Sequence, residues 1–483
     1  MGSRLAWFIH QVYIFLSLNL YPVCCVNNSE HKVLPPSEWT GDKSLILHQY
    51  QRSSPLVTYS IHAMNTSIRE KQFESAIRQL TEKYVTMWNG FPDVEPELLR
   101  RFSQRQQREN ERRLETQLKL YSFHEAEQDA LSPERSHFSF EVIKAIVGSS
   151  FVSGDIINDN FFTDSERITK RFFKDARELD SSLSHDDIHQ ALRNLWVFNS
   201  LQQIRGTDVV LTPSSFAYSL LYPITDNGLD STERTPPEKE AYIHWLSQWF
   251  LGNKCAAADG WTERTAALLR MIENEYPPSE FLDVYLSLRA IHHAQAKSLF
   301  LHNVRSGSNE TSLTKITIEK GGTSVLADGF LTSGMLNDAE IDSFFEYGVL
   351  LQFVDDIRDI HEDRINGHSS PFSRIADSSD LDSAARRLLF FVKHCGEKLS
   401  SLNHSHARQI KQMVEQSCTF LILESAAHHR EYYSSKFIQN VERSLPMSPA
   451  FLDELRHEVE YRQMKNSGRF AFSNVCAGAP FTE

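Results

Sequence analysis

The sequence predicts an all-α protein, and two of its patterns lead to this prediction. Apolar residues recur at three- and four-residue spacing through most of the 483 residues, which is the pattern of a helix with one buried face. Runs of β-branched residues are short, so strands are not expected. A hydrophobic content of 41% supplies enough apolar side chains for one large core.

The expected helices form an N-terminal group and a main group. The first comprises 68–90 and the charged segment 98–121, whose interleaved acids and bases indicate a solvated helix face. The main group begins after residue 136, and Pro, Gly and Asn residues separate its members. Ser184, followed by two acids, is expected to cap the third of them. The main group covers 137–149, 164–178, 186–204, 213–229, 237–251, 261–274, 279–302, 321–335, 338–365, 379–400, 405–433 and 448–464.

These helices divide the chain into four segments. Residues 1–26 are mostly apolar behind Arg4, which indicates a signal peptide, a membrane anchor or an untargeted apolar N-terminus. Residues 27–135 hold a linker and an N-terminal helical extension, 136–445 the main helical domain, and 446–483 a C-terminal helix and tail. We therefore expect the secretory pathway or a membrane if the first segment directs the chain there, and the cytoplasm otherwise.

The charge and the cysteines exclude two classes of partner. A net charge of −13 argues against nucleic acid. The six cysteines lack the spacing of a zinc site and are expected mostly as buried thiols, with disulfides as the alternative because their number is even. Two adjacent histidine pairs, His292-His293 and His428-His429, point in different directions on a helix and are expected as core or surface residues.

The most informative segment is 351–367, which reads LQFVDDIRDIHEDRING. It carries five acids in nine positions, Asp355, Asp356, Asp359, Glu362 and Asp363. The first, third and fourth of these share one helix face, because positions i, i+4 and i+7 are neighbours. Like charges so close destabilise a bare helix. A divalent cation with a preference for oxygen ligands would remove that cost, and Mg²⁺, or Mn²⁺ in its place, is the expected cofactor.

A second acidic pair lies 129 residues upstream. The stretch SLLYPITDNGLDSTER carries Asp226 and Asp230 at i and i+4 after an apolar run. Pro223 is expected to kink or restart the helix, and Gly228 to weaken it. One acidic run alone is more often a solvated face. Two of them, each at the end of an apolar helix, favour a ligand with a diphosphate head and an apolar tail.

The two motifs resemble the Asp-rich motifs of class I isoprenoid synthases. Residues 358–363 (RDIHED) are similar to the RDxxED motif of squalene and phytoene synthases, and 355–359 to the DDxxD of prenyl diphosphate synthases. Residues 320–324 resemble the Lys-Thr element of the latter. Over roughly 185–445 the layout resembles large bacterial terpene synthases. Asn227 inside the first motif departs from the pattern of chain-elongating enzymes.

The resemblance implies a class I terpenoid synthase-like bundle around a central apolar cavity. The implied catalytic residues are Asp226, Asp230, Asp355 and Asp359. The implied metal ligands are Asp226, Asp230, Asp355, Asp356, Asp359, Glu362 and Asp363. The implied diphosphate-binding residues are Arg234, Lys320, Arg358, Arg364 and Arg430. The implied substrate pocket contains Tyr222, Gln295, Thr323, Gln352 and Phe353.

The implied reaction is the magnesium-dependent ionisation of an allylic prenyl diphosphate, followed by cyclisation or elimination, as in a terpene synthase. The first alternative is a prenyltransferase. The RDxxED-like motif of this chain favours head-to-head condensation of two prenyl units. The Lys-Thr-like element favours head-to-tail elongation, but Asn227 argues against elongation. The second alternative is a non-catalytic helical scaffold protein. Membrane association is expected only through the N-terminal apolar segment.

Overall fold

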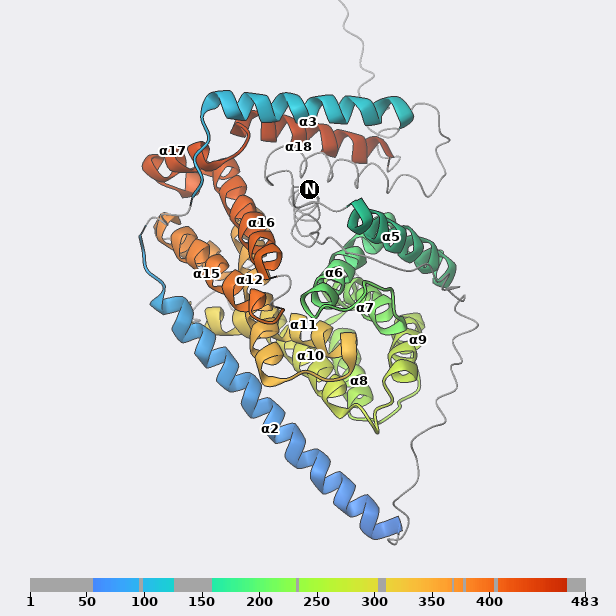
Figure 1. The fold of residues 1–483 in the computed structure, drawn as a ribbon. Coiled ribbons are helices and arrows are strands. Elements are labelled where there is room, and N and C mark those ends of the chain that lie inside the picture. Colours follow the sequence, from blue (N-terminus) through green and yellow to red (C-terminus); the bar gives the residue numbers. More distant parts are fainter. Residues whose placement is uncertain are drawn as a thin grey trace, which may run out of the picture.

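The computed structural model describes residues 55–94, 99–125, 159–231, 234–302, 310–366, 369–376, 379–403 and 407–466. Every regular element within these ranges is a helix (Figure 1), so the all-α prediction is confirmed. None of the helices in these ranges has the length and apolar character that a membrane span requires. The predictions for residues 1–26 and 137–149 lie outside the described residues.

The helices follow one another along the chain with short connections. They are α2 (Pro55–Gly90), α3 (Gln104–Glu125), α5 (Asp159–Leu179), α6 (His185–Ile204), α7 (Pro213–Asp230), α8 (Pro236–Phe250), α9 (Gly260–Glu275), α10 (Leu282–His302), α11 (Glu310–Ser333), α12 (Asp338–Arg358), α13 (Ile360–Asn366), α14 (Pro371–Ala376), α15 (Asp382–Ser400), α16 (Ala407–His428), the 3₁₀ turn η4 (Arg430–Tyr432), α17 (Ser435–Ser444) and α18 (Pro449–Asn466).

Most expected helices are present with boundaries shifted by a few residues, but α2 begins at Pro55, thirteen residues before the expected start at 68, and includes part of the expected linker. The expected cap of α6 is confirmed: the Ser184 side chain accepts a hydrogen bond from the Asp187 amide, and the Asp187 carboxylate accepts one from the Ser184 amide at 2.8 Å. This reciprocal pair satisfies two amides that the first turn of a helix leaves without partners. α14 and α17 were not expected, because helices of six and ten residues repeat the apolar period too few times to be recognised.

Two expectations about helix ends are wrong. The sequence predicts a helix that starts at Gly321 and Gly322, but α11 begins at Glu310 and both glycines lie within it. Pro223 is expected to kink or restart its helix; α7 continues through Pro223 to Asp230, so the helix does not restart there.

The glycines in α11 serve close packing against α12. A Cβ atom on Gly321 would lie 2.6 Å from the carbonyl oxygen of Gly348, and a Cβ on Gly348 would lie 2.1 Å from that of Gly321. Gly322 packs directly against the ring of Phe345. The backbones of α11 and α12 therefore touch where they cross, and this contact holds the Lys-Thr-like element next to the second acidic motif.

The helix predicted over 338–365 is divided in two. α12 ends at Arg358, Asp359 is its C-cap, and α13 begins at Ile360. Helical hydrogen bonds nevertheless bridge the junction, from the Asp359 amide to the Asp355 carbonyl at 2.9 Å and from the Asp363 amide to the Asp359 carbonyl at 2.8 Å. The acidic motif thus keeps nearly helical spacing across the break.

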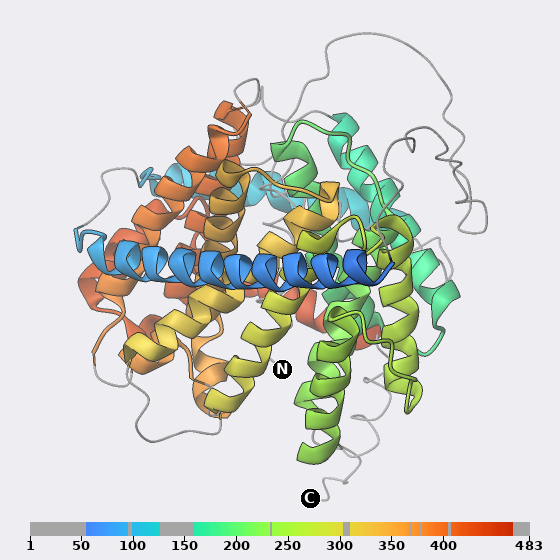
Figure 2. The same cartoon turned by 90° about the horizontal axis from the view of Figure 1, so that it is seen from below.

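The N-terminal helix α2 is part of the main body and crosses one face of the bundle (Figures 1 and 2). The Tyr84 hydroxyl lies 2.8 Å from Asp342 Oδ1 and 3.1 Å from Glu346 Oε2, both on α12. Lys398 Nζ of α15 lies 2.9 Å from Glu346 Oε2, and His394 Nδ1 lies 2.6 Å from Glu346 Oε1. Since Glu346 is fully buried, this network joins three helices.

The C-terminal helix α18 lies beside α3 at one end of the molecule (Figure 1). The Gln107 side chain of α3 donates hydrogen bonds to the carbonyls of Glu442 and Leu445, and Asn110 donates one to Pro446. The Ser448 amide donates to Glu111 Oε1 at 2.8 Å. These contacts cover the end of the bundle away from α7 and α9.

Candidate functional site

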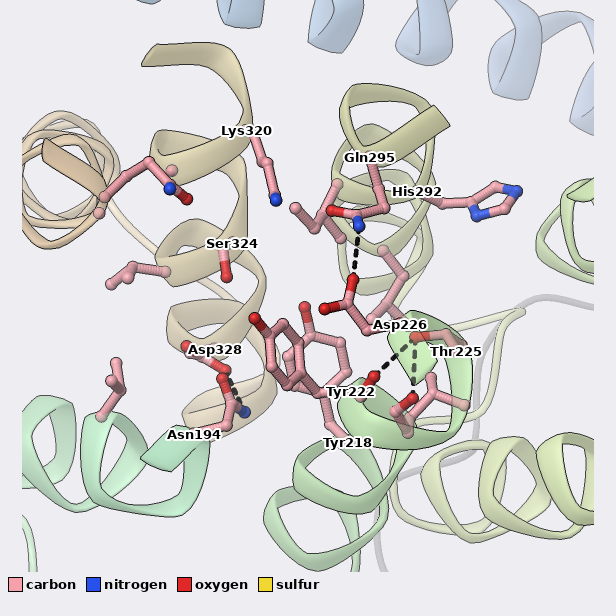
Figure 3. A pocket seen from close by; sticks show the side chains of 18 of the residues that line it. Asn194, Tyr218, Tyr222, Thr225, Asp226, His292, Gln295, Lys320, Ser324 and Asp328 are labelled. Atoms are coloured by element: carbon pink, nitrogen blue, oxygen red, sulfur yellow. Dashed lines mark hydrogen bonds between the residues drawn. The ribbon is translucent and has the colours of Figure 1, made fainter. Parts of the chain in front are cut away.

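A cavity of about 150 Å³ lies among α6, α7, α8, α10, α11 and α12 (Figure 3). Its polar lining residues are Arg193, Asn194, Tyr218, Tyr222, Thr225, Asp226, His292, Gln295, Lys320, Ser324, Asp328, Gln352 and Asp355. Its apolar lining residues include Val197, Leu221, Leu229, Leu246, Phe250, Leu288, Ile291, Val325 and Leu351.

Both acidic motifs reach this cavity. Asp226 enters from the last turn of α7 and Asp355 from the last turn of α12. Asp226 Oδ1 accepts a hydrogen bond of 2.5 Å from Gln295 on α10. Asp355 Oδ2 lies 3.3 Å from the guanidinium of Arg193 on α6. Two carboxylates that are 129 residues apart in the sequence therefore line one space.

The first motif is positioned by packing against α9. The Trp261 indole donates a hydrogen bond of 2.8 Å to the Ile224 carbonyl, and a Cβ on Gly228 would lie 2.2 Å from the same indole. Gly228 is therefore required by this contact, despite its low helix propensity. Asn227 points away from the cavity lining and donates to Asp187 at 2.8 Å. The Asp230 side chain lies outside the described side chains.

The second motif combines burial with crowded carboxylates. Burial is the main cause that raises the pKa of Asp359 to about 7, and the nearby charge of Asp355 is the second cause. Burial is the main cause that raises the pKa of Asp356 well above its ordinary value, and the nearby charge of Asp363 adds to it. The Asp356 carboxyl accepts a hydrogen bond of 2.8 Å from Gln352. Glu362 and Asp363 are partly buried on α13. Ionising this group costs free energy that a bound cation would offset.

The basic residues expected to bind diphosphate differ in position. Lys320 lines the cavity. Arg358 is buried, and burial lowers its pKa to about 10. Arg234 stacks on Trp261 at 4.1 Å, Arg364 donates to the Ala376 carbonyl at 2.9 Å, and Arg430 pairs with Glu442 at 2.6 Å. Of these five predicted residues, only Lys320 is among the described residues that line the cavity.

The residues expected in the substrate pocket also divide. Tyr222, Gln295 and Gln352 line the cavity. Thr323 is fully buried and donates to the Glu319 carbonyl at 2.6 Å within α11. Phe353 packs in the core, with its ring 4.6 Å from that of Trp88. The last two residues therefore support the walls of the bundle.

Four cavity residues are not among the residues predicted from the sequence. Arg193 and Asn194 lie on α6, which shows no acidic or basic pattern, and Ser324 and Asp328 lie on an apolar part of α11. Their role becomes visible only when α6, α11 and α12 are assembled. A spacing signal does exist in hindsight, because Lys320, Ser324 and Asp328 recur every four residues and share one helix face.

The histidines are distributed between the core and the surface. His292 is buried and lies 3.0 Å from both the Ile243 carbonyl and the Ser247 hydroxyl, as expected of a core histidine. His361, His429 and Glu431 place one ligand atom each within 4.8 Å of one another, a spacing that a metal ion could bridge. Among the described cysteines, Cys395 and Cys418 are buried thiols and Cys255 is exposed.

The donor set of the cavity fits Mg²⁺. Asp226 and Asp355 offer carboxylate oxygens, which this ion prefers, and Lys320 and Arg193 offer positive charge for an anion that would share the ion. No known protein family, curated protein or solved structure matches this chain. The cavity and its lining residues are therefore the basis for inferring the function.

Proposed function

We propose that this protein is a magnesium-dependent terpene synthase of the class I type, which ionises an allylic prenyl diphosphate. The observation that carries the proposal is the shared position of Asp226 and Asp355 on one cavity with apolar walls. A cavity with a charged part and an apolar part suits a ligand with an anionic head and a hydrocarbon chain.

The residues of the chain have separate roles in this proposal. Asp226 and Asp355 hold the metal, while Asp356, Asp359, Glu362 and Asp363 set the charge behind it. Bound Mg²⁺ stabilises the negative charge that develops on the leaving diphosphate. Lys320 and Arg193 bind the diphosphate oxygens, and Gln295 orients the Asp226 carboxylate through its 2.5 Å hydrogen bond. The apolar walls exclude water from the chain of the substrate.

A synthase and a prenyltransferase would use the same cavity of about 150 Å³, and they differ in whether a second prenyl chain is joined to the first. The prenyltransferase remains the alternative, and a longer diphosphate as the only product would establish it.

The deciding experiment incubates the purified chain with Mg²⁺ and C10 to C25 prenyl diphosphates. We expect release of inorganic diphosphate and formation of hydrocarbon or alcohol products. Asp226→Asn and Asp355→Asn should each reduce the rate by about 100-fold or more. Asp338→Asn, an exposed acid in the first turn of the same helix as Asp355, is the matched control and should leave the rate unchanged.

Two results would count against the proposal. If none of these substrates releases diphosphate under any metal condition, the chain is better explained as a helical scaffold protein. If the Asp338→Asn control loses as much activity as Asp355→Asn, the loss reflects helix stability and not the metal site.

A further inference from the structure

Asp328 lies at the end of the cavity remote from Lys320. Lys320, Ser324 and Asp328 occupy successive turns on one face of α11, and all three line the cavity (Figure 3). Eight residues of helix rise by about 12 Å. Asp328 therefore lies roughly 12 Å from the residue proposed to bind the diphosphate, measured along the helix axis.

One oxygen of the Asp328 carboxyl is bonded and the other is not. Oδ1 accepts a hydrogen bond of 3.0 Å from the Asn194 side chain on α6. Oδ2 is buried and has no hydrogen-bond partner among the described residues. Asp328 has no exposed surface, and burial raises its pKa well above the ordinary value. Burial favours the protonated form of this carboxyl, and a protonated carboxyl can donate a hydrogen bond from the oxygen that carries the proton, here Oδ2.

The surroundings of Asp328 are those of a binding subsite. Tyr218 and Tyr222 project from α7 toward the same part of the cavity (Figure 3). A buried carboxyl that served the fold alone would be expected to have both oxygens bonded. Here the bonded oxygen is fixed by Asn194, and the remaining oxygen belongs to a side chain that lines the empty space. The protonated Oδ2 of Asp328 can therefore donate a hydrogen bond to an acceptor atom of the ligand.

We propose that Asp328, oriented by Asn194, is a subsite that hydrogen-bonds an oxygen atom at the far end of the ligand's hydrocarbon chain. This inference rests on the proposed function, because it assumes that the diphosphate end of the ligand binds at Lys320. Three extended backbone bonds span about 3.5 Å, so the four main-chain bonds of a prenyl unit span roughly 5 Å. The distance to Asp328 then corresponds to two to three units.

The test compares two unreactive ligands by calorimetry in the presence of Mg²⁺. One is the C10 thiolodiphosphate, and the other is the same compound with a hydroxyl on its terminal carbon. We expect the hydroxylated compound to bind wild-type protein about tenfold more tightly, which is the contribution of one buried hydrogen bond. Asp328→Asn, which keeps a donor and the bond to Asn194, should retain this preference within about twofold.

Asp328→Leu, which keeps the branched shape and removes the donor, should abolish the preference. Equal affinity of the two ligands for wild-type protein, or tighter binding of the plain chain because water occupies the subsite, would overturn the inference and leave the proposed function intact. Failure of both ligands to bind would overturn the proposed function itself. The wild-type comparison decides the matter even if the leucine variant does not fold.

Discussion

At the scale of the residue, Asp359 links the ionisation of the second motif to metal binding. Its pKa is raised to about 7 from 3.8 by burial and by Asp355. Because the folded protein holds this proton more tightly than the unfolded chain, its stability without metal falls as the pH rises from about 4 to about 7. A cation that binds the ionised carboxylates restores that stability at high pH.

Because the pKa of Asp359 is raised, the effect of Mg²⁺ on stability should depend on pH. Mg²⁺ at millimolar concentration should raise the melting temperature by several degrees at pH 8 and by much less at pH 5, because protonated carboxyls do not bind metal. Differential scanning fluorimetry at both pH values measures the shift. Asp359→Asn should weaken the pH dependence. A shift of equal size at the two pH values would show that the ionisation of Asp359 is not coupled to metal binding.

Arg193 and Arg430 give a second prediction at this scale. Arg193 lines the cavity, 3.3 Å from Asp355, whereas Arg430 is exposed and pairs with Glu442. Arg193→Met should weaken the binding of inorganic diphosphate with Mg²⁺ by about tenfold, since a charge-assisted contact is lost. Arg430→Met is the matched control and should bind as the wild type does. Calorimetry would contradict the assignment if the two variants weakened binding equally.

At the scale of the element, the crossing of α11 and α12 sets the geometry of the site. Gly321 and Gly348 bring the two backbones into contact. Gly348→Ala should therefore lower the free energy of unfolding by about 1–3 kcal/mol, because the added methyl group overpacks the crossing. Gly260→Ala, where a Cβ would meet nothing within 4 Å, should be neutral. Urea unfolding measures both, and an unchanged Gly348→Ala variant would mean that the helices can separate at no cost.

One buried acid contributes to the docking of α2. Glu346 contacts Tyr84, His394 and Lys398, and Lys398 also pairs with Asp342 at 2.6 Å. Glu346→Ala leaves buried donors without this acceptor and should cost about 1–3 kcal/mol. Hydrogen exchange should then show α2 opening before the rest of the bundle. Glu109→Ala, which breaks an exposed pair with Arg113, should cost less than about 0.5 kcal/mol, and equal effects would remove the special role of Glu346.

The sequence was sufficient for helices but not for their contacts. Apolar periodicity and the Ser184 cap predict α6 closely, because both signals lie within a few residues of one another. Gly321 and Gly322 do not mark a helix boundary as the sequence predicts. Glycine can end a helix or permit close packing, and only the facing Gly348 and Phe345 show that these glycines have the second role. Local signals cannot contain this information.

At the scale of the whole molecule, the same limit applies to the site. The acids at Asp226 and Asp355 were found from their spacing, and the cavity brings them together. Arg193 and Asp328 were missed because their partners, Asp355 and Asn194, lie 162 and 134 residues away. A basic residue next to an acidic motif in the sequence need not line the cavity. Arg364 follows the second motif directly, but its side chain donates a hydrogen bond to the Ala376 carbonyl of α14.

The size of the cavity leads to the last prediction, which concerns substrate length. A volume of about 150 Å³ is about that of a cavity in another protein that binds one benzene molecule. A C10 chain should fit with less rearrangement than a C20 chain. We therefore expect kcat/KM to fall by about tenfold or more from C10 to C20, measured in a mixture of C10, C15 and C20 diphosphates so that the substrates compete directly.

Phe250 provides the control for this prediction, because its ring forms part of the cavity wall. Phe250→Leu removes volume from the wall and should shift the preference toward C15 while leaving diphosphate release in place. Lys254, which pairs with Glu273 nearby on the surface, can be changed to Met as a variant with no effect on chain length. A wild-type preference for C20 that Phe250→Leu does not alter would show that the hydrocarbon chain binds outside this cavity.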